Sequence, residues 1–443
     1  MNGIPAAAAI SRAEGALPTR RTRPVPGPVP SRVVVINDRS LAFGGATGLA
    51  LLSARLLRAR GIPVTYLTGD AGENPALAEA GIPVHALGGR RLLEADALAS
   101  LRRGLYNPAT LDLVGDLIRH DDPGTVYHLH TWSQILSPSV FRALEPVRER
   151  LFVSTHDFFL TCPNGAYALF RQGKACPHVP LGLACVTAQC DRRSYAHKLW
   201  RVARQAVQAR TLRYREAAPR VLAIHAAMRP LLVRGGVPEA AITTVPNPIN
   251  PWSATRIAAE RNRAFVFVGR LNEEKGPDLA ARAARAAGVP LMVIGDGPLL
   301  ETLRRAHPEV HFAGRQPSEA VAQFVRDARA LIMPSRYPEP YGLVAGEALW
   351  SGLPVILTDQ ALLAADIVSR EAGLACDPRD GAALAGALAR LAGDDALTER
   401  MSRNAFTRTA DLGHSAEGWT DALLDAYAAA LAEAVQPRTA PPV

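Results

Sequence analysis

Lysine, cysteine and long apolar runs are all scarce in this sequence. Of the 50 basic residues, only Lys174, Lys198 and Lys275 are lysines. Five cysteines in 443 residues, with no recognisable export signal, argue against a disulfide-stabilised secreted fold and for reduced thiols. No apolar stretch approaches the roughly 20 residues that a membrane-spanning helix needs. We therefore expect a cytoplasmic globular protein that does not span a bilayer.

Basic residues outnumber acidic ones and give the chain a net charge of +9. This excess favours an anionic partner, and a nucleic acid, an anionic membrane face and a phosphorylated ligand all qualify on charge alone. The motifs described below favour the phosphorylated ligand, so we expect no nucleic-acid partner.

The length and punctuation of the chain indicate two domains. A chain of 443 residues suits two cores of roughly 150 to 220 residues each. Residues 1–30 are rich in Ala, Pro and Arg and are expected to form a disordered tail. We place an N-terminal domain at 31–248 and a C-terminal domain at 249–415. A last helix at 416–435 either continues the second domain or crosses back to the first.

Both halves alternate short β-branched runs with helix-length segments. RVVVIN at Arg32 to Asn37 is followed by a Gly-containing loop and a periodic segment that stops at Gly61. A second series starts at Phe265 with FVFVG and continues through LMVIG, VHFAG, ALIMPS and PVILTD. This alternation predicts an α/β protein of two Rossmann-like domains that face each other across a cleft. Ligands of such sheets bind beyond the carboxyl ends of the strands.

Two strand-end loops in the second half carry the strongest chemical signals. VGRLNEEKG, Val268 to Gly276, places Arg270 and Lys275 together, and two such cations form a clamp for a diphosphate. In Leu331 to Leu357, a buried strand ends in a Pro-rich loop and a helix opens after Gly342. Backbone N–H groups at that helix start suit a phosphate, and Glu339 and Glu347 suit sugar hydroxyls.

Together, VGRLNEEKG and EPYGLVAGE resemble the donor-site signature of glycosyltransferase family 4. The resemblance extends from Val33 to about Ala430 and implies a GT-B fold and a retaining, metal-independent transfer from a nucleoside diphosphate sugar. On this reading Glu347 binds the ribose, Glu339 the sugar hydroxyls, and Arg270 with Lys275 the diphosphate. The implied donor site of the C-terminal half is Arg270, Lys275, Glu339, Tyr341, Gly342, Leu343 and Glu347.

The N-terminal half is expected to face this donor site with a glycine pair and a histidine. Gly44 and Gly45 let the backbone approach a ligand, and in the family such a pair lies against the donor phosphates or the acceptor. His156 follows a predicted strand at the position where the family has a histidine near the transferred sugar. We assign it a sugar contact, or the positioning of the attacking hydroxyl, with Asp157 as its neighbour. His128 and His130 are expected behind it.

Four of the five cysteines lie in one insertion at about 160–195. Cys162, Cys176, Cys185 and Cys190 could hold a structural zinc ion, with His178 as a substitute ligand. Their spacings of 13, 8 and 4 residues lack a C-x-x-C knuckle, so free thiols or a redox pair remain open. No metal or other cofactor is expected for catalysis.

After the cysteines, Tyr195 to Glu216 reads as a basic helix with apolar residues at helical spacing. Such a helix could lie peripherally on an anionic membrane, at the inner face, near a lipid-linked acceptor. An ordinary core helix with an Arg-rich solvent face explains the pattern too, and the sequence slightly favours it.

The predicted function is transfer of a sugar to a glycan, a lipid-linked saccharide or another acceptor, in bacterial polysaccharide or glycoconjugate synthesis. A GT-B sugar-nucleotide epimerase and a non-catalytic nucleotide-sugar-binding partner protein are the alternatives. A nucleotide-binding dehydrogenase is disfavoured, because no G-x-G-x-x-G follows the first strand.

Overall fold

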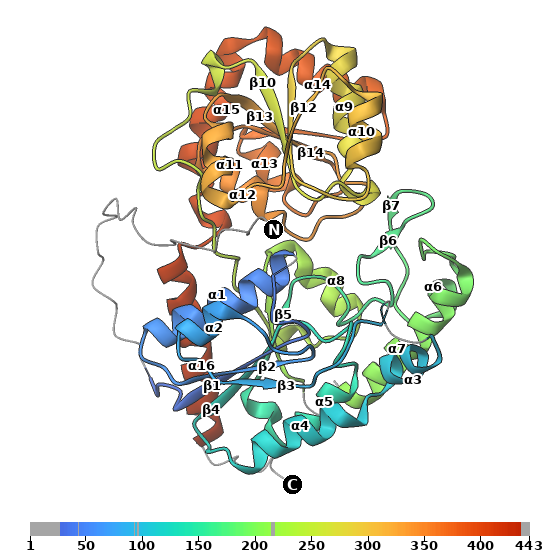
Figure 1. Ribbon diagram of the computed structural model, residues 1–443, viewed down its shortest axis with the longest axis vertical. Coiled ribbons are helices and arrows are strands. Elements are labelled where there is room, and N and C mark those ends of the chain that lie inside the picture. The colour runs from blue at the N-terminus through green and yellow to red at the C-terminus, as the bar shows by residue number, and fades with distance from the viewer. Residues whose placement is uncertain (1–26, 43, 93, 95–96, 214–217, 436–443) are drawn as a thin grey trace, which may run out of the picture.

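The computed structural model describes residues 27–42, 44–92, 94, 97–213 and 218–435. These residues form two α/β domains, one stacked on the other (Figure 1). Most of the predicted N-terminal tail lies outside the described residues.

The N-terminal domain is built on a parallel sheet of seven strands in the order β3-β2-β1-β4-β5-β8-β9. The central strands are buried along their length, because helices cover both faces of the sheet and apolar β-branched runs can fill both sides. The strands are β1 (Arg32–Asn37), β2 (Val64–Thr68), β3 (Val84–Ala86), β4 (Thr125–Leu129), β5 (Leu151–Thr155), β8 (Arg220–Ala223) and β9 (Ile242–Thr244). The helices are α1 (Gly45–Ala59), α2 (Pro75–Glu79), α3 (Ala97–Leu105), α4 (Pro108–Arg119), α5 (Ser139–Ala143), α6 (Leu183–Thr187), α7 (Tyr195–Leu212) and α8 (Arg229–Arg234), with 3-10 turns η1 (Glu145–Arg150), η2 (Ala226–Met228) and η3 (Glu239–Ala241).

The C-terminal domain has a second parallel sheet, of six strands in the order β12-β11-β10-β13-β14-β15. Its strands are β10 (Ala264–Val268), β11 (Leu291–Ile294), β12 (His311–Gly314), β13 (Ala328–Met333), β14 (Val355–Thr358) and β15 (Gly373–Cys376). Its helices are α9 (Pro277–Ala287), α10 (Leu300–Ala306), α11 (Ser318–Val325), α12 (Leu343–Trp350), α13 (Ala364–Ser369), α14 (Gly381–Gly393) and α15 (Asp395–Arg408), with η4 (Ala259–Arg261), η5 (Glu273–Lys275) and η6 (Ala410–Leu412). Separate apolar clusters fill the two faces of this sheet.

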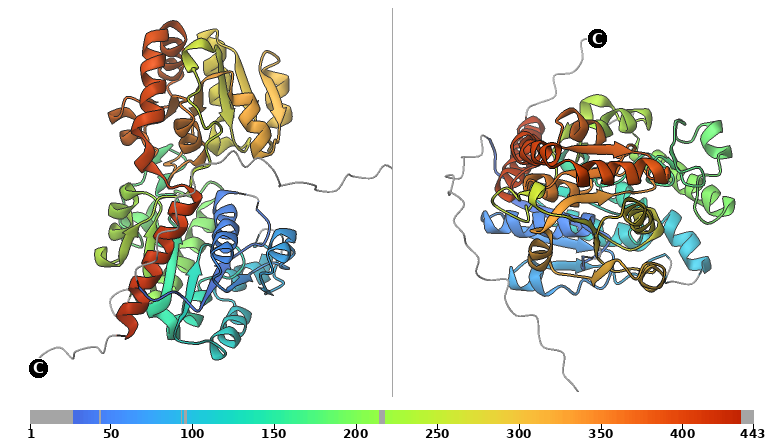
Figure 2. Two further views of the ribbon diagram at one scale, coloured as in Figure 1. Left: turned by 90° about the vertical axis from the view of Figure 1, so that its left-hand side faces the viewer. Right: turned by 90° about the horizontal axis from the view of Figure 1, so that it is seen from above.

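The last helix, α16 (Ala416–Val435), leaves the C-terminal domain and runs along the N-terminal one (Figure 2). Trp419, Leu423 and Tyr427 pack into the apolar cluster between α1 and the N-terminal sheet. The guanidinium of Arg60 contacts the Asp421 carboxylate at 2.6 Å. The final helix therefore ties the two domains together.

The cysteine-containing insertion follows β5. It includes a two-stranded hairpin, β6 (Ala168–Leu169) and β7 (Lys174–Ala175), and then α6. The hairpin projects toward the C-terminal domain (Figure 1), where the Gln360 amide donates to the Gly173 carbonyl at 2.9 Å. The insertion thus bridges the two domains on one side.

Helix α7 differs from the amphipathic helix that its sequence suggests. Its buried side chains include Arg204, Gln205 and Gln208, whereas Leu199 is 43% exposed. The reason lies in the loop after β5, whose carbonyls need donors: Gln205 donates to the Leu160 carbonyl at 3.1 Å, and Gln208 donates to the same oxygen at 2.9 Å. The end of the predicted helix, at 214–216, lies outside the described part of the chain. Among the helices that the structure describes, none has the length and apolar character needed to cross a bilayer.

Candidate active site

A cleft of about 750 Å³ lies between the two domains. Its N-terminal wall is formed by residues that follow β1, β4 and β5 and by the start of α1, and its C-terminal wall by residues that follow β10 and β13 and by the start of α12. The cleft therefore lies at the carboxyl ends of both parallel sheets, the place where α/β folds bind ligands.

The loop after β10 brings the predicted cations into this cleft. Arg270 is exposed and lines it, and Lys275 ends the short turn η5. Gly276 follows with φ 67°, and a Cβ there would lie 2.3 Å from the Pro334 carbonyl oxygen. Only glycine allows this close packing, which holds the Lys275 loop against the end of β13.

Lys275 and Glu339 form an ion pair within the cleft. The Lys275 ammonium lies 2.6 and 2.8 Å from the two Glu339 carboxylate oxygens, and the Ser335 hydroxyl donates to Glu339 at 3.0 Å. Glu339 is only 6% exposed. Burial alone would raise the pKa of Glu339, but the charge of Lys275 and these hydrogen bonds outweigh burial and lower it. Glu339 is therefore ionised, and Lys275 keeps one N–H for a ligand.

Two helix N-termini meet at the same place. Gly342 precedes α12 with φ 78°, and a Cβ there would lie 2.8 Å from the Met333 sulfur. Gly45 begins α1, where a Cβ would lie 3.2 Å from a methyl group of Leu343 in the opposite domain. The first N–H groups of a helix lack acceptors within the helix and carry partial positive charge, so this junction suits an anion.

Two of the residues predicted to bind the sugar donor, Glu347 and Tyr341, present less of their side chains to the cleft than the others. Glu347, on α12, is not among the cleft-lining residues, and burial raises its pKa to about 7. No described side chain pairs with its carboxylate. Tyr341 does line the cleft, but its hydroxyl donates to the Leu412 carbonyl at 2.6 Å, so only its ring is available to a ligand.

On the opposite wall, His156 ends a chain of polar side chains. Its Nε2 lies 2.9 Å from Nδ1 of His130, whose Nε2 lies 3.4 Å from the Ser53 hydroxyl. Ser53 donates to the Ala50 carbonyl, so it must accept from His130, and His130 must in turn accept from His156. Burial lowers the pKa of His156 to about 4, which keeps the ring neutral. This network assigns the proton of His156 to Nε2 and leaves Nδ1 as an acceptor, which has no partner among the described residues.

His128 lies behind His156, and Asp157 lies beside it. His128 is fully buried between the Ser154 hydroxyl at 2.8 Å and the Tyr427 hydroxyl at 2.6 Å. Asp157 lines the cleft, and burial raises its pKa to about 6, although it accepts a hydrogen bond from the Phe159 N–H.

The sequence motifs do not identify several residues of the cleft. Asp38 accepts three backbone N–H bonds, from residues 134 to 136, and so fixes the loop after β4. Tyr337 hydrogen-bonds Glu339, and the Asn247 side-chain oxygen is buried without a partner in the described structure. Asp38 directly follows β1, so the strand-end rule could have identified it. Asn247 precedes Pro248 where relatives of the resembled family usually have glycine, a departure visible in the sequence that did not identify it as a cleft residue.

A second pocket of about 610 Å³ opens beside the cleft. It shares Arg91, Ser133, Gln134 and Phe159 with the cleft. The remaining lining comes largely from α7, from α3 and from the segments before these two helices, and includes Leu92, Leu101, Trp200, Arg193, Arg201 and Arg204. This pocket thus places apolar and aromatic side chains next to several guanidinium groups.

Comparison with known proteins assigns a family to the larger part of the C-terminal domain. Residues 251–408 match the family model described as glycosyl transferases group 1. The chain is 32% identical to glycogen synthase of Mycobacterium tuberculosis over 186 residues, which cover 38% of this chain and 44% of that protein. It is 35% identical to D-inositol 3-phosphate glycosyltransferase of Nocardia farcinica over 187 residues, 38% of this chain and 40% of that protein. The chain therefore spans less than half of these curated relatives.

Solved structures extend the likeness to the whole fold. Sucrose-phosphate synthase from Thermosynechococcus elongatus superposes with a TM-score of 0.67 at 19% identity, covering 91% of this chain and 100% of that one. HepE of Anabaena, in complex with UDP-glucose, superposes with a TM-score of 0.60 at 15% identity, covering 91% and 100%. The predicted α/β fold of GT-B type is confirmed. Residues 251–408 form a group 1 glycosyltransferase domain, which is the domain of a transferase enzyme, within a chain of GT-B fold.

Proposed function

We propose that this chain is a retaining glycosyltransferase that moves a sugar from a nucleoside diphosphate sugar to an acceptor hydroxyl on a glycan or a lipid-linked saccharide. The observation that carries this proposal is the junction of α1 and α12. There two helix N-termini, the Lys275–Glu339 pair and Arg270 surround one point of the cleft, opposite an unpartnered nitrogen of His156.

Each part of a donor finds a partner of the right chemistry in this arrangement. The diphosphate is placed at the start of α12, between Arg270 and the remaining N–H of Lys275. The ribose hydroxyls donate to Glu347, whose carboxylate lacks a described partner. The transferred sugar donates to Glu339 and to Nδ1 of His156. Protein cations and a helix terminus thus supply the charge that opposes the diphosphate.

The proposed reaction breaks the bond between the anomeric carbon and the phosphate oxygen. The acceptor oxygen bonds to the same face of that carbon, and its proton passes to the departing phosphate oxygen. Arg270, Lys275 and the α12 terminus stabilise the negative charge that grows on the diphosphate. This route needs no side chain as a general base, and the low pKa of His156 is in keeping with a positioning role.

The donor proposal is tested by thermal unfolding with a panel of nucleoside diphosphates and their sugars. We expect one base to stabilise the protein selectively, by about 2.7 kcal/mol at a ligand concentration of 100 times Kd. HepE was solved with UDP-glucose, so UDP and its sugars are the first ligands to try. No stabilisation by any nucleotide would remove the basis for the proposal. Conversion of the donor to an epimer without an acceptor would point to an isomerase instead.

The pocket beside the cleft is the proposed acceptor site. Its mixture of Trp200, Leu92 and arginines suits an acceptor with an apolar and an anionic part, such as a lipid-linked phosphosugar. We expect Trp200→Ala to raise the acceptor KM by about tenfold, because aromatic stacking area is lost, while the donor KM stays constant. Steady-state kinetics with each substrate varied in turn measures both.

The same pocket suggests how a membrane-borne acceptor would arrive. Val179, Leu183 and Leu199 are 60%, 82% and 43% exposed on or near α6 and α7. We propose that these side chains rest on an anionic membrane. Co-flotation with anionic vesicles should fall for Leu183→Ser; equal flotation of both proteins, or none of either, contradicts the contact.

A further inference from the structure

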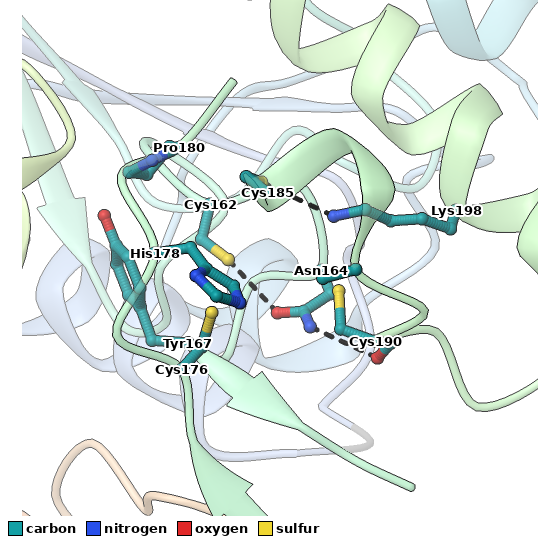
Figure 3. A pocket seen from close by; sticks show the side chains of 10 residues that line it. Cys162, Asn164, Tyr167, Cys176, His178, Pro180, Cys185, Cys190 and Lys198 are labelled. Atoms are coloured by element: carbon teal, nitrogen blue, oxygen red, sulfur yellow. Dashed lines mark hydrogen bonds between the residues drawn. The ribbon is translucent and has the colours of Figure 1, made fainter. Parts of the chain in front are cut away.

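The four cysteines of the insertion line one small cavity. Cys162, Cys176, Cys185 and Cys190 come from different turns of the segment after β5, and Figure 3 shows their side chains around a common space with His178. Three of them, Cys162, Cys185 and Cys190, are buried. The cavity measures about 10 Å³, room for roughly one water-sized particle. Folding therefore brings together thiols that are spread over 29 residues.

Backbone N–H groups are directed at two of these sulfurs. The N–H groups of Asn164 and Tyr167 act on the Cys162 sulfur, and the N–H of His178 acts on the Cys176 sulfur; they lower the pKa of these thiols, although burial outweighs them and raises it. At Cys162 and at Cys176 a proline follows the cysteine, and the residue after that proline supplies an N–H group. Donors of this kind stabilise a thiolate rather than a thiol, as in the shell around a bound metal.

Lys198 supplies an independent observation. It is 1% exposed, and its ammonium lies 3.5 Å from the Cys185 sulfur and also hydrogen-bonds Cys190. None of the ion pairs among the described residues joins it to a carboxylate, and Asp191, next to Cys190 in the chain, pairs with Arg201 at 2.8 Å. A buried ammonium needs a negative partner, and neutral thiols do not provide one.

We propose that Cys162, Cys176, Cys185 and Cys190 bind one structural zinc ion as four thiolates. Four thiolates and Zn²⁺ carry a net charge of about −2, which gives Lys198 its counter-charge. Binding releases the four thiol protons and forms four Zn–S bonds in a closed tetrahedral site. A closed site without an open position serves the fold and not the transfer reaction.

The side chains need to rotate to make this site. Among the described residues, no three His, Cys, Asp or Glu side chains already hold metal-ligand positions. The Cys162 thiol, for example, is turned toward the Asn164 side-chain oxygen at 3.1 Å. Because all four cysteines line the same cavity, closing them on an ion requires side-chain rotation and local adjustment, without a change of fold.

The ion would fix one wall of the cleft. The hairpin between Cys162 and Cys176 contacts the C-terminal domain through Gly173 and Gln360, and Arg192, just after Cys190, pairs with Glu274 in the donor loop. Bound zinc would thereby fix the parts of the insertion that make these two contacts with the C-terminal domain.

The test is the metal content of the full chain, purified without chelator, by inductively coupled plasma mass spectrometry. We expect about one zinc per chain in the wild type, and release of that zinc when a mercurial reagent binds the thiolates and displaces it. Cys176→Ser and Cys190→Ser should each lose most of it. Cys376→Ser is the matched control, because Cys376 lies on β15 of the other domain, and it should keep the metal.

Replacement by cobalt tests the ligand set without any variant. Tetrahedral Co²⁺ bound to four thiolates gives intense visible d–d bands and a sulfur-to-metal charge-transfer band. A wild type that contains no stoichiometric metal and shows no such spectrum on adding Co²⁺ would overturn the proposal. So would native mass spectrometry that finds the four cysteines joined as disulfides, or equal metal content in Cys176→Ser and Cys376→Ser.

Discussion

Lys275→Ala is expected to lower sugar transfer by about 100- to 1,000-fold, since one donor to the developing charge of the diphosphate is lost. The same change removes the partner of Glu339, which is 6% exposed, and leaves that carboxylate unpaired. Loss of one partner of a buried pair costs about 3 kcal/mol of unfolding free energy. Turnover under saturating donor and urea unfolding measure the two effects separately.

A double variant separates these two consequences. In Lys275→Ala with Glu339→Gln no uncompensated charge remains, so much of the lost stability should return while transfer stays low. Lys174→Ala, at an exposed position on β7 outside the cleft, is the matched single substitution and should leave turnover near the wild-type rate. Recovery of transfer in the double variant would show that Lys275 acts only by neutralising Glu339.

Donor binding is expected to weaken by about tenfold per pH unit below about 7, the pKa to which burial raises Glu347. In the proposed donor site the ribose hydroxyls donate to the ionised carboxylate of Glu347, so binding must expel the proton when this group is protonated. Glu347→Gln should bind the donor weakly at every pH and abolish the slope. Calorimetry in buffers of different ionisation enthalpy should detect the released proton at pH 6.

Two controls isolate Glu347 from other titrating groups. Asp157 lines the cleft and has a pKa raised to about 6, so Asp157→Asn should keep the slope near pH 7 if Glu347 causes it. A nucleoside diphosphate sugar must be the ligand, because a free diphosphate has its own proton with a pKa of roughly 6. A pH-independent donor affinity in the wild type would remove Glu347 from the binding site.

The stability of the fold is expected to depend on the pH in the opposite direction to donor binding, through the same residue, Glu347. Because burial raises the pKa of Glu347 from 4.5 to about 7, the folded protein holds this proton more tightly than the unfolded chain does. Its contribution to unfolding free energy is therefore full below pH 4.5 and is lost as pH rises through 7. Glu347→Gln should lack this loss and be the more stable protein at pH 8, although it binds donor less well.

The sequence by itself determined the two sheets and the strand-end loops that line the cleft. Runs such as RVVVIN and FVFVG are apolar without alternation, and such runs are stable only inside covered parallel sheets. The rule that ligands bind at strand ends then pointed to Arg270, Lys275 and Glu339, because each follows a strand closely in the chain. These are local properties, carried by periodicity and by residue type.

Only the tertiary structure decided which of these groups meet. Lys275 and Glu339 are separated by 64 residues, and their pairing depends on how β10 and β13 lie side by side. The neutral tautomer of His156 follows from a chain through His130 and Ser53, on three different elements. The same holds for three further features: α16 crosses back to the N-terminal domain, α7 turns polar side chains inward, and four cysteines gather around one cavity. Each depends on contacts between distant segments, and such contacts leave no periodic signal in the sequence.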